Sequence, residues 1–318
     1  MKSCRLGNSQ IMLSQIIMGT WQAGKAMWSG IDDNETTKAI KTAFDSGITT
    51  FDTAEQYGNG HSEMILGDAL KGERDRVVYA TKVAPQNLSR PRIIEACNNS
   101  LKNLGTDYID IYQIHWPSGS WGSEVVPIEE TMEAMDDLKK QGKIRAIGVS
   151  NFSTAQLKEA MSFGDILSIQ PPCSLFWRHA EKEIIPYGIE HNLTILAYSP
   201  MAQGVLTGRF KEGHKFPKKD HRSKNKLFRP ENIKRVQEAL VRLSIIAEKN
   251  NASLGQLALA WVISHSGTCA IAGARNPDQV LQNAKAPDIF LSEEDLAEMD
   301  LIGRSVTDPM DDNPVMWG

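Results

Sequence analysis

The residues best suited to chemistry stand at the ends of four strand-like runs in the first half of the chain. The runs are TTFDTA (49–54), VVYATKV (77–83), IDIYQIH (109–115) and IRAIGVSN (144–151). They deliver Asp52, Lys82, His115 and the pair Ser150–Asn151, and Tyr57 lies just after the first run. Charged side chains are seldom fully buried unless they are paired. Because catalytic groups gather at the C-terminal strand ends of a parallel β/α barrel, this pattern predicts an enzyme.

Four of these side chains suit one reaction. A phenol normally holds its proton to a pH of about 10, and an ammonium at Lys82 would lower the pKa of Tyr57 and improve it as an acid. Asp52 would supply the counterion of Lys82, and the imidazole of His115 would orient a substrate oxygen. Such a set suits protonation of a carbonyl oxygen during hydride delivery. Hydride transfer needs a nicotinamide cofactor, because no side chain can supply it.

Alternating strand and helix patterns must position these groups. Four more apolar runs complete a set of eight: QIIMGTW (15–21), LSIQPP (167–172), TILAYSP (194–200) and TCAIAG (268–273). Eight βα units in about 300 residues match a closed barrel, so we expect an α/β fold, a single (β/α)8 TIM barrel domain over residues 1–318. A doubly wound sheet is the competing architecture. The glycine-rich turn at 58–63 lacks the third glycine of its dinucleotide fingerprint, which favours the barrel.

Helical stripes fill the gaps between the strands. The apolar spacing of Ile128, Met132, Met135 and Leu138 predicts one helix, and the run from Ile233 to Ala247 predicts another. About 30 residues separate Pro200 from Pro230, and they contain the basic run 215–226. Loops of this length are usually functional or disordered, so this loop after strand 7 is either a solvated segment or a clamp over a cofactor. The stretch from Gly303 is expected to be a C-terminal tail over the barrel mouth.

Net charge, hydropathy and cysteine content exclude several classes of protein. A formal net charge of −4 argues against a nucleic-acid binder. No apolar segment approaches the roughly 18 residues of a membrane span, so we expect no membrane partner and a cytoplasmic protein. The four cysteines form no C-x-x-C pair, which predicts reduced thiols and no metal site. A monomer is expected.

Longer motifs around the candidate residues carry a resemblance to a known family. They are MGTW (18–21), GITTFDTAEQYGNGHSE (47–63), ATK (80–82), LGTDYIDIYQIHWP (104–117), GKIRAIGVSNF (142–152), AYSPMAQGVLTG (197–208) and GARNPDQVLQNAKA (273–286). In this order they resemble the aldo-keto reductases over essentially the whole chain. The likeness is greatest to the bacterial and plant-type branch that includes general stress aldo-keto reductases. It implies a barrel that binds NADPH/NADP+ across its C-terminal face.

The resemblance also implies roles for individual residues. The implied catalytic tetrad is Asp52, Tyr57, Lys82 and His115. The implied cofactor residues are Gly19, Thr20, Trp21, Ser150, Asn151, Gln170, Tyr198, Ser199, Pro200, Met201, Gln203, Gly204, Arg209, Gly273, Arg275, Gln279, Gln282 and Asn283. Within that set, Ser150, Asn151 and Gln170 resemble the residues that hold the nicotinamide carboxamide, and Tyr198 resembles the aromatic that stacks on the ring.

The adenosine end departs from one branch of the family. A lysine and a serine open the corresponding stretch in the aldose reductases, whereas Gly273 and Ala274 open it here. The 2′-phosphate would then be held by the planar guanidinium of Arg275 and by a base from the long loop, such as Arg209 or Arg222. The preference for NADPH over NADH rests on this segment.

Aromatic residues are expected to wall the substrate pocket. The expected pocket residues are Trp21, Trp28, Tyr57, His115 and Trp116. Such a pocket would favour small aldehydes with apolar or aromatic character. The resemblance implies that specificity lies in loops, here 23–33, 117–126, 176–181 and the C-terminal tail.

The expected function is NADPH-dependent reduction of aldehydes or ketones to alcohols, with Tyr57 as general acid. One alternative is an NADPH-binding, redox-sensing module like the potassium-channel β subunits, which share the barrel and would show little turnover. A second is a sugar-phosphate isomerase, which would need no nicotinamide. Consumption of NADPH with carbonyl compounds distinguishes the three.

Overall fold

Eight parallel strands close into a barrel in the computed structural model, which describes residues 1–311, 313, 315 and 316. The strands run around the barrel in the order β10-β3-β4-β5-β6-β7-β8-β9. They are β3 (Ile16–Gly19), β4 (Thr50–Asp52), β5 (Val78–Val83), β6 (Ile109–Ile114), β7 (Ile144–Ser150), β8 (Ile166–Gln170), β9 (Thr194–Tyr198) and β10 (Thr268–Gly273). Each expected run overlaps one of these strands, so the predicted (β/α)8 barrel is confirmed.

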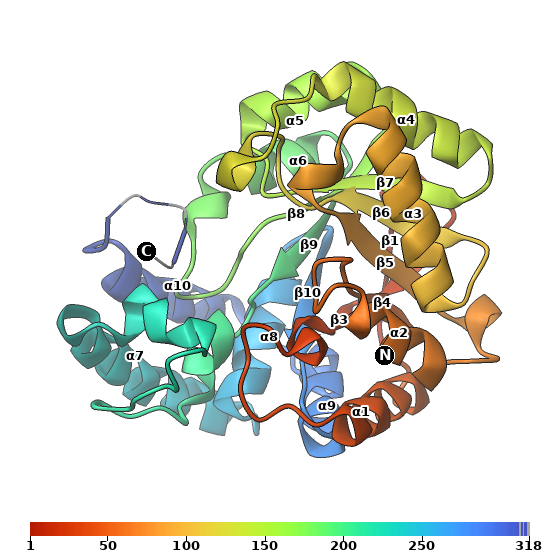
Figure 1. Ribbon diagram of the computed structural model, residues 1–318. Coiled ribbons are helices and arrows are strands. Elements are labelled where there is room, and N and C mark those ends of the chain that lie inside the picture. The colour runs from red at the N-terminus through yellow and green to blue at the C-terminus, as the bar shows by residue number, and fades with distance from the viewer. Residues whose placement is uncertain (312, 314, 317–318) are drawn as a thin grey trace.

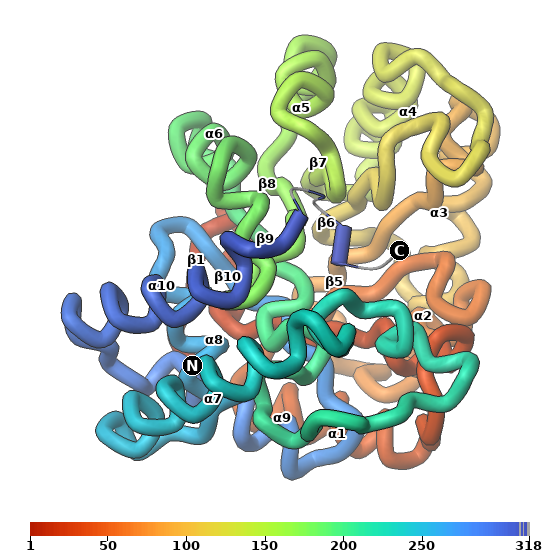
Figure 2. The backbone as a smooth tube through the Cα atoms, turned by 90° about the vertical axis from the view of Figure 1, so that its left-hand side faces the viewer, coloured from red at the N-terminus to blue at the C-terminus, as the bar shows by residue number. Residues whose placement is uncertain are grey.

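Helices surround the strands, as Figure 1 shows from the side and Figure 2 shows roughly along the barrel axis. They are α1 (Asp33–Asp45), α2 (His61–Ala69), α3 (Arg90–Leu104), α4 (Ile128–Lys140), α5 (Thr154–Met161), α6 (Ile184–Glu190), α7 (Pro230–Lys249), α8 (Leu254–Ser264), α9 (Pro277–Ala284) and α10 (Glu293–Thr307). The main hydrophobic core lies where their apolar faces pack against the barrel. Because both faces of the sheet are covered, the strands are almost continuously apolar.

The helical stripes of the sequence lie on these buried faces. Ile233, Val236 and Leu243 of α7 are buried, as are Met132 and Met135 of α4. The helix α8 begins with a complete capping box, in which the Ser253 side chain accepts from the Gln256 backbone and the Gln256 side chain accepts from the Ser253 backbone. Pattern and capping therefore identify these helices correctly.

An N-terminal hairpin closes the opposite end of the barrel from the strand ends that carry the polar residues. The strands β1 (Ser3–Arg5) and β2 (Met12–Ser14) pair antiparallel just before β3. The side chains of Leu6 and Leu13 are fully buried in the cluster that fills the barrel interior. Thr194, the first residue of β9, donates its hydroxyl to the carbonyl of Arg5 at 2.9 Å. The sequence pattern does not predict this hairpin, since each strand has only three residues.

The register of the barrel brings the polar strand ends to one level. Asp52 pairs with Gly19 on one side and with Ala80 on the other, while Lys82 pairs with Gln113. Further around the barrel, Ser150 pairs with Gln170. Because all these strands are parallel, these residues share the C-terminal face of the barrel.

The long loop between β9 and α7 is confirmed, and the C-terminal tail returns to it. Three short 3-10 turns build the loop: η6 (Ala202–Thr207), η7 (His221–Lys224) and η8 (Lys226–Phe228). The backbone N–H of Lys226 donates to the carbonyl of Met316 at 2.8 Å, and its ammonium lies 2.6 Å from the Asp311 carboxylate. The tail begins later than expected, because Gly303 lies inside α10 and packs against the backbone of Leu175.

Two further features bear on the class of protein. No helix in the part of the chain that the structure describes is both long and apolar enough to cross a membrane. The four cysteines are free thiols.

Candidate active site

A buried ion pair stands at the centre of the site. The ammonium of Lys82, which is fully buried on β5, lies 2.6 Å from Asp52 Oδ1 at the end of β4. It also donates to the carbonyl of Thr53 at 2.7 Å. A buried charge is costly unless it is paired and hydrogen-bonded, and both conditions are met here.

The same ammonium reaches the phenol of Tyr57. Lys82 Nζ lies 3.3 Å from Tyr57 Oη, so Asp52, Lys82 and Tyr57 form one connected chain of polar contacts. Tyr57 lies in the turn between β4 and α2, where the backbone packs closely against Gly24. A Cβ on Gly24 would lie only 2.5 Å from the Tyr57 carbonyl carbon, so glycine is required at that position for this turn to fit.

His115 completes the group of four. It directly follows β6, and its backbone N–H donates to the carbonyl of Val83 at 2.9 Å. Its ring stands edge-on to the ring of Tyr57 with 5.7 Å between centroids. The tertiary structure therefore brings together all four residues that the sequence singled out.

Burial dominates the proton affinities in this group. Burial first, and then the charge of Asp52, raise the pKa of Tyr57 well above its usual value. Burial and the charge of Lys82 lower the pKa of His115 well below its usual value, so its imidazole is neutral at neutral pH. Burial also lowers the pKa of Lys82, although Asp52 acts in the opposite direction. The expected lowering of the Tyr57 pKa is not found, because desolvation of the phenolate and the nearby charge of Asp52 both raise it.

A polar network continues from Asp52 around the barrel. Gln170 Nε2 donates to Asp52 Oδ2 at 2.9 Å and to Gln113 Oε1 at 3.1 Å. Gln113 is fully buried on β6, and it is not among the residues predicted from the sequence. Its signal was a polar residue between Tyr112 and Ile114 in an apolar strand, the same signal that revealed Lys82.

Three of the expected carboxamide-binding and ring-stacking residues also touch one another. The phenol of Tyr198 donates to Asn151 Oδ1 at 2.8 Å, and Asn151 Nδ2 donates to Ser150 Oγ at 3.0 Å. Asn151 has a φ of 61°, a left-handed conformation that asparagine tolerates better than most residues. These contacts fix the side chains at the rim above Gln170.

One cavity of about 990 Å³ joins these groups. Of the residues expected to bind cofactor or substrate, the following line it: Gly19, Trp21, Trp28, Tyr57, His115, Trp116, Ser150, Asn151, Gln170, Tyr198, Ser199, Pro200, Met201, Gln203, Gly204, Arg209, Gly273, Arg275, Gln279, Gln282 and Asn283. Thr20 does not line it, because its hydroxyl is buried against Asp52 and Ser62. Lys82 does not line the cavity, but it contacts Asp52 and Tyr57, which do.

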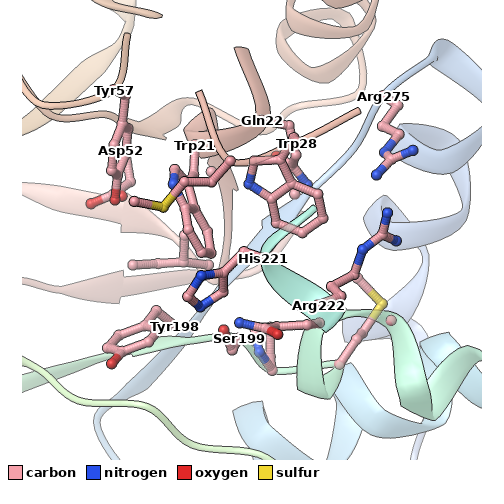
Figure 3. A pocket seen from close by; sticks show the side chains of 18 of the residues that line it. Trp21, Gln22, Trp28, Asp52, Tyr57, Tyr198, Ser199, His221, Arg222 and Arg275 are labelled. Atoms are coloured by element: carbon pink, nitrogen blue, oxygen red, sulfur yellow. The ribbon is translucent and has the colours of Figure 1, made fainter. Parts of the chain in front are cut away.

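Cations gather at the other end of the cavity, as Figure 3 shows, with Trp21 and Trp28 between them and Tyr57. Arg222 and Arg275 stand at this end, and Arg209 and Lys224 also line the cavity. Burial first, and then the charges of Arg222 and Arg209, lower the pKa of Arg275. Arg275 Nη2 is buried with no hydrogen-bond partner among the described residues. Clustered guanidiniums with an unsatisfied donor suit an anionic ligand.

The long loop closes over this end. Arg222 is bound through two nitrogens to the buried carboxylate of Asp220, at 2.8 and 2.6 Å. Asp220 also accepts from the hydroxyl of Ser29 at 3.0 Å. The guanidiniums of Arg222 and Arg275 lie 4.9 and 5.4 Å from the Trp28 ring, so Trp28 packs beside the cations.

Gln22 is a second residue that sequence analysis missed. It lines the cavity, and its amide packs so closely on Gly273 that a Cβ there would lie 2.1 Å from Gln22 Nε2. A side chain at position 273 would therefore require the flexible Gln22 amide to move away. No feature of the sequence alone pointed to a partner for Gly273.

The barrel and the polar cluster at its C-terminal face define an enzyme of the (β/α)8 class. The model of the aldo/keto reductase family matches residues 15–304. The chain belongs to this family and is an oxidoreductase.

Individual relatives agree with that assignment. The chain is 38% identical to the Bacillus subtilis aldo-keto reductase YhdN over 98% of this chain and 96% of that protein. It is 34% identical to the NADH-specific methylglyoxal reductase of Escherichia coli, over 94% and 97% of the two chains.

Solved structures give the same result. A glycerol dehydrogenase from Gluconobacter oxydans is 35% identical, with a TM-score of 0.88 over 97% of each chain. An aldo-keto reductase from Klebsiella pneumoniae in complex with NADPH is 32% identical, with a TM-score of 0.79 over 100% of this chain and 98% of that one.

Proposed function

We propose that this protein reduces aldehydes and ketones to alcohols with NADPH, and that Tyr57 is the proton donor. The observation that carries the proposal is the position of Lys82 Nζ, 2.6 Å from Asp52 and 3.3 Å from Tyr57 Oη, at one end of a cavity whose other end is cationic. A fixed acid and an anion site in one cavity suit a carbonyl compound beside a phosphorylated cofactor.

The residues present fit the cofactor. The cavity volume of about 990 Å³ lies near the upper end of the usual range for ligand pockets. Arg275 has a buried donor without a partner among the described residues, while Arg222 is already neutralised by Asp220. Arg275 would therefore hold the 2′-phosphate, with Arg209 and Lys224 adding positive charge. Ser150, Asn151 and Gln170 would hold the carboxamide end.

When bound, the reduced nicotinamide supplies a hydride to the carbonyl carbon. Tyr57 donates its proton to the carbonyl oxygen, and its raised pKa keeps that proton in place until then. The phenolate left behind lies 3.3 Å from Lys82 Nζ, whose charge stabilises it. Neutral His115 orients the substrate oxygen, and Asp52 holds Lys82 in place.

The test is turnover with both nicotinamides. The purified protein is mixed with NADPH or NADH and a panel of methylglyoxal, nitrobenzaldehydes and glyceraldehyde, and absorbance at the nicotinamide band is followed while the alcohol is quantified. We expect NADPH oxidation with matching alcohol formation, and slower oxidation of NADH.

Two other outcomes would identify the alternatives. Tight NADPH binding with negligible turnover of every carbonyl compound would indicate a redox-sensing module. Absence of NADPH binding, with isomerisation of a sugar phosphate, would overturn the proposal.

A further inference from the structure

Two of the four cysteines meet at the end of the barrel opposite the candidate active site. Cys4 lies in the hairpin strand β1, and Cys269 is the second residue of β10. Cys269 is fully buried in the apolar cluster that fills the barrel interior, and the side chain of Cys4 packs against the same cluster. Cys97 and Cys173 belong to the main hydrophobic core instead. The fold therefore pairs two thiols from opposite ends of the chain.

Backbone hydrogen bonds fix the hairpin beside β10 on one side of Cys4. The N–H of Gln15 donates to the carbonyl of Lys2 at 2.9 Å. The carbonyl of Gln15 in turn accepts from the N–H of Ala270 at 3.0 Å. Ala270 directly follows Cys269, so this chain of contacts runs from the hairpin to the strand that carries the second thiol.

A second contact fixes the hairpin on the other side of Cys4. The hydroxyl of Thr194 donates to the carbonyl of Arg5 at 2.9 Å. Thr194 begins β9, and Leu196 of the same strand pairs with Cys269. Cys4 is thus held from both sides against the first turn-facing residues of β9 and β10. The meeting of the two thiols follows from the fold and does not depend on one mobile side chain.

The two thiols differ in proton affinity. A hydrogen bond from the Cys269 thiol lowers the pKa of Cys4 to about 7, although burial acts in the opposite direction. The same hydrogen bond, together with burial, raises the pKa of Cys269 well above its usual value. Near neutral pH, Cys4 is therefore partly a thiolate while Cys269 keeps its proton. Because the thiolate is the nucleophile, Cys4 is the reactive member of the pair.

Access from solvent points to the same sulfur. The structure describes all four cysteines, and of these only Cys4 is partly exposed. Burial raises the pKa of Cys97 to about 12, and burial also raises the pKa of Cys173. Oxidation of thiols is selective for exposed thiolates, so an oxidant reacts first at Cys4. Cys269 is then the neighbouring thiol that can resolve the oxidised sulfur.

We propose that Cys4 and Cys269 form a reversible disulfide in response to hydroperoxides, which ties the N-terminal hairpin to the barrel. With hydrogen peroxide, the Cys4 thiolate attacks one oxygen, the O–O bond breaks, and Cys4 sulfenic acid and hydroxide are formed. The Cys269 sulfur then attacks the Cys4 sulfur. The S–S bond forms as the sulfenic oxygen leaves with the Cys269 proton as water, so the two thiols are oxidised by two electrons and the peroxide is reduced by two.

The first test is treatment of the reduced protein with hydrogen peroxide, followed by acid quenching and counting of free thiols. We expect the parent to lose two of its four thiols with a mass decrease of about 2 Da, and dithiothreitol to restore them. Non-reducing peptide mapping should give one linked pair, Cys4 with Cys269. Retention of all four thiols, addition of oxygen without a link, or a link between other cysteines would overturn the proposal.

Matched variants assign the reaction to the pair. Cys4→Ser removes the partly exposed thiol, and Cys97→Ala removes a buried thiol elsewhere as the control. We expect the first variant to keep its three remaining thiols and the second to lose two of its three. Equal thiol loss in Cys4→Ser and the parent would show that Cys4 is not the reactive sulfur.

A third variant, Cys269→Ala, isolates the effect of the hydrogen bond. Its Cys4 should gain oxygen in peroxide without forming a link. Alkylation of Cys4 by iodoacetamide at pH 7 should be about tenfold slower than in the parent, because the Cys4 pKa returns toward its ordinary value. Alkylation as fast as in the parent would show that Cys269 does not activate Cys4.

Unfolding in urea tests whether the bond ties the hairpin down. A link between Cys4 and Cys269 closes most of the chain into one loop and restricts the unfolded state. We expect the urea midpoint of the parent to rise after peroxide treatment and that of Cys4→Ser to stay unchanged. An unchanged or lower midpoint for the linked parent would overturn the tie. Neither cysteine lines the cavity, and no readout here uses turnover, so the result is independent of the proposed function.

Discussion

The two ends of the cavity are built in opposite ways. At the catalytic end, Asp52 and Lys82 belong to neighbouring barrel strands, and their register fixes the contact between them. At the cationic end, Arg222 comes from the long loop after β9, and Arg275 comes from the turn after β10. Proton transfer depends steeply on geometry, whereas attraction of a phosphate tolerates adjustment. The barrel strands therefore carry the ion pair that contacts Tyr57, and loops carry the cations at the other end.

The ends also differ in charge balance. The ammonium of Lys82 is paired with Asp52, and Gln170 satisfies the second carboxylate oxygen. At the other end only Arg222 has a carboxylate partner among the pocket cations, within the part of the chain that the structure describes, and Arg275 keeps an unsatisfied donor. The charges of Asp52 and Lys82 neutralise each other within the protein. The excess positive charge and the free donor of Arg275 would instead be satisfied by an anionic ligand.

The largest expected effect lies at the catalytic end. Tyr57→Phe removes the donated proton but keeps the ring, so we expect kcat/KM for aldehyde reduction to fall by about 10²- to 10⁴-fold. NADPH affinity, measured by fluorescence titration, should change little because the cations lie at the far end. Full activity in this variant would show that the Tyr57 hydroxyl is not the proton donor and that the residue serves only in packing.

Breaking the balanced pair should cost stability as well as activity. Lys82→Met leaves the buried Asp52 carboxylate without its cation, so we expect unfolding in urea to require about 3–5 kcal/mol less. The double variant Lys82→Met/Asp52→Asn removes both charges and should recover much of that stability while staying inactive. A double variant as unstable as the single one would show that charge pairing is not the cause.

The cationic end should respond in affinity alone. Arg275→Leu removes the unsatisfied guanidinium, so we expect the dissociation constant of NADPH to rise about 10- to 100-fold and that of NADH to stay near the parent value. The ratio of the two constants is read from parallel fluorescence titrations, with Arg275→Lys as the charge-retaining control. Equal weakening of both nucleotides would place Arg275 away from the 2′-phosphate.

The smallest expected effect concerns the dependence of kcat on pH. We expect kcat to show no transition near neutral pH that comes from titration of Tyr57. Reduction needs protonated Tyr57, and a raised pKa keeps the phenol protonated until the pH exceeds its usual titration range. We expect kcat to vary less than about threefold between pH 6 and 9 and to decline above 10. His115, whose pKa is lowered, should cause no change of kcat in that pH range. A midpoint near 7 or 8 that Tyr57→Phe abolishes would show that bound cofactor reverses the effect of burial.

Much of the fold and the core of the site could be predicted. Asp52, Lys82 and His115 stood out because each is polar at the end of an apolar run, and the barrel predicted that these ends meet. Gln113 carried the same signal within its strand and was overlooked. The hairpin of β1 and β2 was out of reach because three-residue strands leave too short a pattern to detect.

Other properties needed the packed molecule. The sequence suggested that Lys82 lowers the pKa of Tyr57, but how far each group is desolvated depends on the surrounding fold. Trp28, expected to line the substrate pocket, lines the cavity and also packs against Arg222 and Arg275. Only the packed molecule shows this second contact, because the long loop reaches the segment around Ser29.

The order of strands and helices, the types of the reacting groups and their place at the strand ends follow from the sequence pattern, since periodicity and residue chemistry are local properties. Which cation of the cavity is neutralised, and which keeps an unsatisfied donor, follows only from the packed molecule. Those outcomes depend on contacts between segments far apart in the chain, and on the burial that such contacts create. Neither the contacts nor the burial can be predicted from a short stretch of residues.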